Sequence, residues 1–331
     1  DSRSVNMLSA LIGVTKSARA AVTLSSLVFI QCNFSYWVFA FLCLAPTIDA
    51  IYQTPISCVL DVDSGKRKAF ESYCLLKGTF VLNEEGEVFK PLYYLWVQYA
   101  MLVCCFSTQF GYLIYKHVLW GKYIDDLVDG IKKSQTLKKA EAWSFLKKMV
   151  TWKRIQVDST RWALSFVFYE TLICEVIFIQ IAICDFLLEG AFTQLIFHFV
   201  FYNEIKTETL FPIETKCTMH QHGPSGTITN LDGLCIMRLN LINRMVFIMA
   251  WVWLVFMSLV AIVGIFWRIR CFFLYKNVSF NNCVWRNNGV MGSKKVMSYL
   301  RVVLEQSSFS EWLYLYYIFK NLDLELSNIV L

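Results

Sequence analysis

The sequence predicts an all-α membrane protein: a four-transmembrane-helix bundle with a small disulfide-linked extracellular α+β cap and a cytosolic helical layer. Three observations predict this class. First, 56% of the 331 residues are apolar and only 17% are charged, and the charges are segregated along the chain. Second, four nearly charge-free stretches each exceed the roughly 20 residues that a helix needs to cross a bilayer. Third, two of the intervening loops each carry a pair of cysteines.

The four expected spans are the longest apolar stretches of the chain. They cover residues 20–46, 92–115, 163–184 and 245–267. The segments outside the membrane are then 1–19, 47–91, 116–162, 185–244 and 268–331. The first span is longer than the apolar core of about 7–15 residues found in signal peptides, so we expect it to be retained. A fifth apolar patch at 195–202 is too short to cross.

The distribution of basic residues predicts the orientation of the chain. Segments 1–19, 116–162 and 268–331 carry three, eleven and eight Lys or Arg, which is 22 of the 31 in the chain. The other two segments together carry nine. Because basic loops remain in the cytosol, both termini are expected to be cytosolic. The net charge of +6 therefore indicates cytosolic faces near lipid headgroups and no nucleic-acid site.

Local patterns predict structure outside the membrane. In the first outer loop, a short helix is expected from Lys66 to Leu76, ending at Gly78. In the second outer loop, turn residues from His222 to Gly226 predict short β-structure on either side. Apolar residues at helical spacing predict cytosolic helices in 116–161 and in 294–319.

Four of the twelve cysteines lie in the outer loops, namely Cys58, Cys74, Cys217 and Cys235. An even set of cysteines in an oxidising compartment predicts disulfides, but four cysteines allow three pairings and sequence alone does not choose between them. A zinc site that uses His220 and His222 beside Cys217 is the weaker alternative, because the spacings match no common zinc pattern.

Two acidic residues, Glu170 and Glu175, lie inside the third expected span. An acid within a membrane is costly and often functional, for example in a proton relay or as an ion ligand. Five residues along a helix place them about 140° apart, so they do not form one site. The simpler interpretation is that each hydrogen-bonds to a neighbouring helix or faces water. The chain contains no nucleophile, phosphate-binding or dinucleotide motif, so we expect no catalysis, cofactor or metal.

Several short motifs in chain order resemble the innexins, the invertebrate gap-junction proteins. Tyr93, Tyr94, Trp96 and Val97 are similar to the YYQWV signature of that family, with Leu95 in place of Gln. In the first outer loop, the family's PI-x-C motif is similar to Pro55-Ile56-Ser57-Cys58 and its Y-C motif to Tyr73-Cys74. In the second outer loop, FPxxTKCT is similar to Phe211-Pro212 with Lys216-Cys217-Thr218, GPSG to Gly223-Pro224-Ser225-Gly226, and LCxLPLNxxN to Leu234-Cys235 with Leu239-Asn240 and Asn243. The CEV motif is similar to Cys174-Glu175-Val176 in the third span, and the KNLD motif to Lys320-Asn321-Leu322-Asp323 near the end. Two cysteines in each outer loop suit this family, whereas connexins would need three.

The resemblance implies a plasma-membrane gap-junction subunit that forms ring-shaped homo-oligomers, or hetero-oligomers with related subunits, around a pore for ions and small metabolites. Two rings on adjacent cells would dock through the outer loops. The segment before the first span would enter the pore, which makes Met7, Leu8, Leu11 and Ile12 candidate lining residues. The compact tail also suits viral members of the family.

The resemblance also points to crossed disulfides, Cys58 to Cys235 and Cys74 to Cys217. The positions agree with this pairing, since Cys58 follows the first span closely and Cys235 precedes the fourth. Two alternative functions stay open at this point: a four-span adhesion or scaffold protein without conductance, and an intramembrane enzyme or transporter that uses Glu170 and Glu175.

Overall fold

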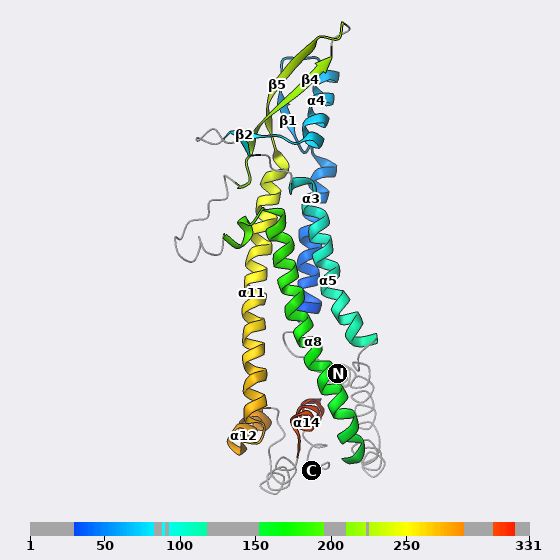
Figure 1. Cartoon of the computed structure of the whole chain (residues 1–331), viewed down its shortest axis with the longest axis vertical. Helices are drawn as coiled ribbons and strands as arrows, with labels where there is room; N and C mark the ends of the chain where they lie inside the picture. Colours follow the sequence, from blue (N-terminus) through cyan, green and yellow to red (C-terminus); the bar gives the residue numbers. More distant parts are fainter. Residues whose placement is uncertain are drawn as a thin grey trace, which may run out of the picture. The chain divides into compact units, whose positions relative to one another are not determined.

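The structure is a computed structural model that describes residues 30–82, 88–89, 93–117, 152–194, 210–222, 225–287 and 307–321. Figure 1 shows the order of the elements along the chain. They belong to two compact units. Unit 1 comprises Asp1–Phe29, Gly111–Ile173 and Ala261–Leu331, and unit 2 comprises Ile30–Phe110 and Cys174–Val260. Helices α5, α8 and α11, whose bounds follow, contribute residues to both units.

Long helices make up most of the described chain, as the sequence predicts. They are the π-helical turn η1 (Ile30–Ser35) with α3 (Tyr36–Tyr52), then α5 (Val97–His117), α8 (Trp152–Leu187) and α11 (Arg238–Leu274). Two helical segments of the described residues, Ser159–Leu187 and Arg238–Leu274, are long and apolar enough to cross a membrane. They contain the third and fourth expected spans. Part of the first expected span, 20–29, lies outside the described residues.

Polar side chains within the helices of unit 2 bond to neighbouring helices. Gln180 of α8 donates to the Cys104 carbonyl at 3.1 Å and to the Ser107 hydroxyl at 2.9 Å, both on α5. Gln109 of α5 donates to the Cys32 carbonyl of η1 at 2.7 Å. Such bonds hold helices together where no water is present to satisfy a polar group.

A small α+β cap forms the rest of unit 2, which confirms the cap predicted from the sequence. It contains β1 (Ser57–Val59), α4 (Ser64–Lys77), β2 (Val81–Leu82), β3 (Val88–Phe89), β4 (Glu214–His222) and β5 (Ile228–Ile236). Strands β4 and β5 form an antiparallel hairpin, and β1 joins the free side of β5, so the order is β1-β5-β4. Strands β2 and β3 pair separately. The predicted β-structure around the turn before Gly226 is thus confirmed.

The helix α4 occupies the position expected for a short helix in the first loop and is slightly longer. The Asp63 carboxylate accepts a hydrogen bond from the Ser64 N–H at the N-terminus. Gly78 ends the helix with a φ of 94°, a conformation that side chains disfavour, and its N–H bonds to the Cys74 carbonyl. The predicted end at Gly78 is therefore confirmed.

In unit 1, two short helices, α12 (Val278–Asn287) and α14 (Phe309–Asn321), pack against each other. The Trp312 indole N–H donates to the Asn281 side-chain oxygen at 2.8 Å. Ser308 and Glu311 exchange bonds in a capping box that starts α14. Helical structure expected within 294–319 is confirmed from residue 309 onward. Within 116–161, the described residues 116–117 and 152–161 are helical and 118–151 lie outside the described part.

Candidate functional site

The cap is held by a disulfide between two facing strands. In the antiparallel pair of β1 and β5, Cys58 lies directly opposite Cys235. Their Cα atoms are 4.0 Å apart, and the structure joins the two sulfur atoms. Close facing pairs of an antiparallel ladder bring side chains near one another, so the strand register places both thiols for bonding. The bridge connects residues that are 177 positions apart in the chain.

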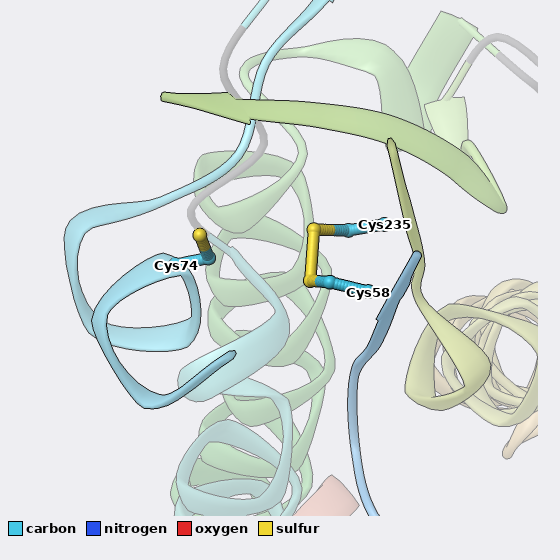
Figure 2. A group of neighbouring side chains, drawn as sticks. All are labelled: Cys58, Cys74 and Cys235. Carbon is cyan, nitrogen blue, oxygen red and sulfur yellow. A yellow bond between two sulfur atoms is a disulfide. The ribbon is translucent and has the colours of Figure 1, made fainter. Parts of the chain in front are cut away.

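A second disulfide joins Cys74 on α4 to Cys217 on β4, with Cα atoms 5.9 Å apart. The two bridges are neighbours. The sulfur atoms of Cys58, Cys74 and Cys235 all lie within 4.8 Å of one another, and Figure 2 shows Cys74 beside the Cys58–Cys235 bond. Each bridge links the first loop to the second, which is the crossed pairing that the family resemblance implies.

The same sulfur cluster leaves little basis for the zinc alternative. Zinc binds cysteine as a thiolate, and a sulfur atom in a disulfide is not available in that form. All four loop cysteines are in disulfides. His220, one of the two histidines of that alternative, lies on β4 with its Nδ1 2.7 Å from the Asn230 side-chain oxygen on β5.

The interior of the cap is closely packed around Phe70. This side chain and Cys74, one turn further along α4, are fully buried. A Cβ atom at Gly233 of β5 would lie 3.0 Å from Phe70 Cε1 and 3.1 Å from Leu60 Cδ2. These separations are shorter than ordinary van der Waals contact, so the position opposite Cys217 accepts only glycine without rearrangement.

The tyrosine signature connects the cap to the helices of unit 2. Tyr93 and Tyr94 lie in η2 (Tyr93–Leu95) and are 6% and 2% exposed. Their hydroxyls donate to the carbonyls of Leu210 and Leu75, each at 2.8 Å. Aromatic residues near a membrane boundary commonly form a belt at the lipid surface, but these two side chains are covered by protein. Val97 is also buried, whereas Trp96 is exposed.

A second family motif fastens the start of α11. The Asn240 side chain is buried and donates to the Pro212 carbonyl at 2.8 Å, while the Met237 N–H donates to the Ile213 carbonyl at 2.8 Å. The Pro55 carbonyl accepts from the Leu239 N–H. Residues from both loops thus converge on the first turn of α11.

Unit 1 contains a partly buried ion pair, with side chains 17% and 16% exposed, that the sequence pattern did not reveal. The Arg268 guanidinium of α11 donates two hydrogen bonds to the Glu170 carboxylate of α8, at 2.6 and 2.8 Å. It also hydrogen-bonds to the Tyr317 hydroxyl and lies over the Phe166 ring at 5.3 Å. Burial raises the pKa of Tyr317, so this phenol stays neutral at physiological pH. A signal in the sequence that could have indicated this pair is an acid, Glu170, inside the third expected span together with the first basic residue after the fourth span, Arg268.

The two acids expected inside the third span have different environments. Glu170 is bonded to a neighbouring helix, which confirms the simpler interpretation for this residue. Glu175 lies on the exposed side of α8. Other expected site residues, namely Met7, Leu8, Leu11, Ile12, Gly223 and Pro224, lie outside the described part of the chain. Ser225 and Gly226 are exposed at the hairpin turn.

Together, apolar helices of membrane-spanning length and a doubly bridged cap define a membrane protein whose two loops are cross-linked into one body. The family comparison makes the assignment specific. The model of the innexin family matches residues 26–330, and the chain belongs to that family.

Individual relatives are similar over shorter stretches. Innexin inx7 of Drosophila melanogaster is 28% identical over 272 residues, which are 72% of this chain and 59% of that protein. Innexin inx2 of Schistocerca americana is 34% identical over 117 residues, 32% of this chain and 33% of the relative. Innexin inx4 of Anopheles gambiae is 23% identical over 313 residues, 82% and 76% of the two chains. The chain thus spans between one third and about three fifths of the length of the first two relatives.

Replacing Cys58 or Cys74 by Ser should destabilise the cap. Each substitution removes a bridge that closes a long loop, a loss of about 2–5 kcal/mol. We expect the assembled fraction of purified protein to fall in size-exclusion chromatography. The control is Cys174→Ser on α8, a half-buried cysteine that belongs to neither disulfide, which should have little effect. Recovery of a Cys58–Cys74 peptide in a non-reducing digest would contradict the crossed arrangement.

Breaking the ion pair on one side should cost more than removing it entirely. Glu170→Gln or Arg268→Met leaves the partner without its counter-charge, which destabilises by about 3 kcal/mol for a largely buried pair. The double variant Glu170→Leu with Arg268→Met leaves no orphaned charge and should recover much of that loss. Thermal unfolding in detergent measures all three. Additive losses in the double variant would show that the two side chains are not energetically coupled.

Proposed function

We propose that the chain is a subunit of a large-pore gap-junction channel or hemichannel that passes ions and small metabolites between cells. The observation that carries this proposal is the innexin match over residues 26–330. The cap supports it, because a surface that must meet another ring of subunits needs loops of fixed shape. Two crossed bridges supply that rigidity from residues far apart in the chain.

A four-span topology with both termini in the cytosol is part of the proposal. Helices α8 and α11 would supply the third and fourth spans. Helix α5 has 21 residues, about 31 Å at 1.5 Å per residue, and so matches the thickness of the bilayer core. Helix α3, with η1 and the residues before it, would form the first span. The excess of basic residues in 1–19, 116–162 and 268–331 supports the orientation.

The proposed assembly is a closed ring of identical or related subunits in the plasma membrane, with a second ring docking from an adjacent cell. Ring symmetry allows one kind of subunit to enclose a pore. The proposal includes no reaction, cofactor or nucleic acid. The alternative use of the membrane acids in an enzyme or transporter has less support, because Glu170 is engaged by Arg268.

Expression in cells should produce a conductance of low selectivity together with uptake of a small fluorescent dye. Both signals should rise with the amount of protein at the cell surface, since one wide pore carries both. Surface biotinylation provides the control for delivery to the membrane. Normal surface expression with neither current nor uptake, also after removal of external calcium, would instead favour an adhesion or scaffold protein.

The pore-lining role of the N-terminal segment has its own test. Residues Met7, Leu8, Leu11 and Ile12 form an apolar cluster ahead of Lys16 and Arg19, and in the proposed channel this segment enters the cytosolic mouth. Deleting residues 1–12 should change the unitary conductance or leave channels open in single-channel recordings. An unchanged conductance would indicate a tail that does not reach the pore, as is common for termini.

A further inference from the structure

One side of α8 in unit 2 carries a charged residue among large exposed apolar side chains. Glu175 is exposed, and its neighbours along the helix, Phe178, Ile179 and Phe186, are 71%, 53% and 85% exposed. Residues three, four and eleven positions apart share one side of a helix. The side defined by these four residues is called the Glu175 face below. Within the described part of the chain, no side chain forms an ion pair or hydrogen bond with the Glu175 carboxylate.

Glu175 itself lies deep in the proposed membrane span. Glu175 is twelve residues after Ala163 and nine before Cys184, the ends of the apolar stretch. At 1.5 Å per residue it is about 18 Å and about 14 Å from those ends. From this depth even a lysine or arginine side chain covers only part of the distance to the lipid headgroups. The shorter glutamate side chain therefore does not reach them.

The opposite side of the same helix shows how α8 treats polar groups that its own protomer covers. Gln180 is fully buried and donates to Cys104 and Ser107 of α5. Glu175 is turned away from these contacts. Among the described residues of one protomer, α5 therefore accepts two hydrogen bonds from the Gln180 amide nitrogen, whereas nothing accepts or donates a bond at the Glu175 carboxylate.

Neither lipid nor a water-filled pore fits the whole face. Lipid would leave a carboxylate without a hydrogen-bond donor, which is why acids in spans turn to protein or water. Pore water would solvate Glu175 but would also contact Phe178, Ile179 and Phe186, an extended apolar surface of the kind that marks a protein contact. Only a protein surface with a donor suits both parts.

We propose that a second copy of this chain covers the Glu175 face and supplies a hydrogen-bond donor to the carboxylate. This inference rests on the ring assembly proposed above, and it adds which surface of the protomer faces its neighbour. The aromatic and aliphatic side chains provide the apolar contact between protomers. Glu175 then sets the register of that contact, because a buried acceptor accepts only an arrangement that brings a donor to it.

Site-specific photo-crosslinking tests the proposal in the full-length channel in membranes. The photoreactive residue p-benzoylphenylalanine replaces Phe178, which is exposed on the face, or Phe166, a fully buried phenylalanine of the same helix that serves as the matched control. We expect an adduct of twice the protomer mass after irradiation of the Phe178 variant and none for the Phe166 variant. Phospholipid adducts at position 178 without protein dimers would overturn the inference, as would no adduct at all.

Substitution of the acid gives a second, independent measurement. Glu175→Gln keeps an acceptor and should assemble nearly as the parent protein does, whereas Glu175→Leu removes it and should lower the assembled fraction by about tenfold. If lipid covered the face, Glu175→Leu would assemble at least as well as the parent.

Recording dye uptake from the same cells separates a failure of the proposed interface from a failure of the proposed channel. Normal uptake with only lipid adducts at position 178 would reject this interface and leave the channel intact. No uptake from parent protein at the surface would reject the channel itself, and dimer adducts would then still support the interface.

Discussion

The bond between Cys58 and Cys235 is the constraint on which the cap depends. It joins two strands that already face each other in the β1–β5 ladder, so covalent linkage and strand register reinforce one another. The strands belong to loops that are separated by 177 residues. Fixing them together also fixes the entry of α11, because Pro55 and Pro212, each close to the sheet, accept hydrogen bonds from its first turn. The conformation of the two loops therefore determines where α11 begins.

Outside the cap, the need to satisfy polar groups in an apolar setting organises each unit separately. In unit 2, Gln180 and Gln109 bond to backbone carbonyls of neighbouring helices. In unit 1, Arg268 donates hydrogen bonds to both carboxylate oxygens of Glu170 and also hydrogen-bonds to Tyr317 of α14. A hydrogen bond in lipid has no competing water, so these few residues decide which helix faces meet. Among the described residues, Glu175 is an acid within a helix whose side chain is exposed.

The family motifs acquire physical meaning from these contacts. The two tyrosines after the first loop are buried anchors that bond to Leu75 and Leu210, and the asparagine after the second loop holds the Pro212 carbonyl. Trp96, in the same signature, is exposed, so neighbouring residues of one motif lie in different environments, buried or exposed. Position near a membrane boundary does not distinguish these environments, because sequence spacing indicates depth but not which side of the chain is covered.

The sequence by itself determined the class of protein, the third and fourth long helices, the end of α4 at Gly78 and the hairpin before Gly226. These features depend on local chemistry: charge-free length, a left-handed glycine and turn residues. The crossed cysteine pairing was expected only from the family resemblance, and the strand register supplies its physical basis. Only the tertiary structure decided that Arg268 reaches Glu170 and that Gly233 packs against Phe70. Each of these joins residues that are tens to hundreds of positions apart. Periodicity along one helix carries no information about the residue that lies across from it on another.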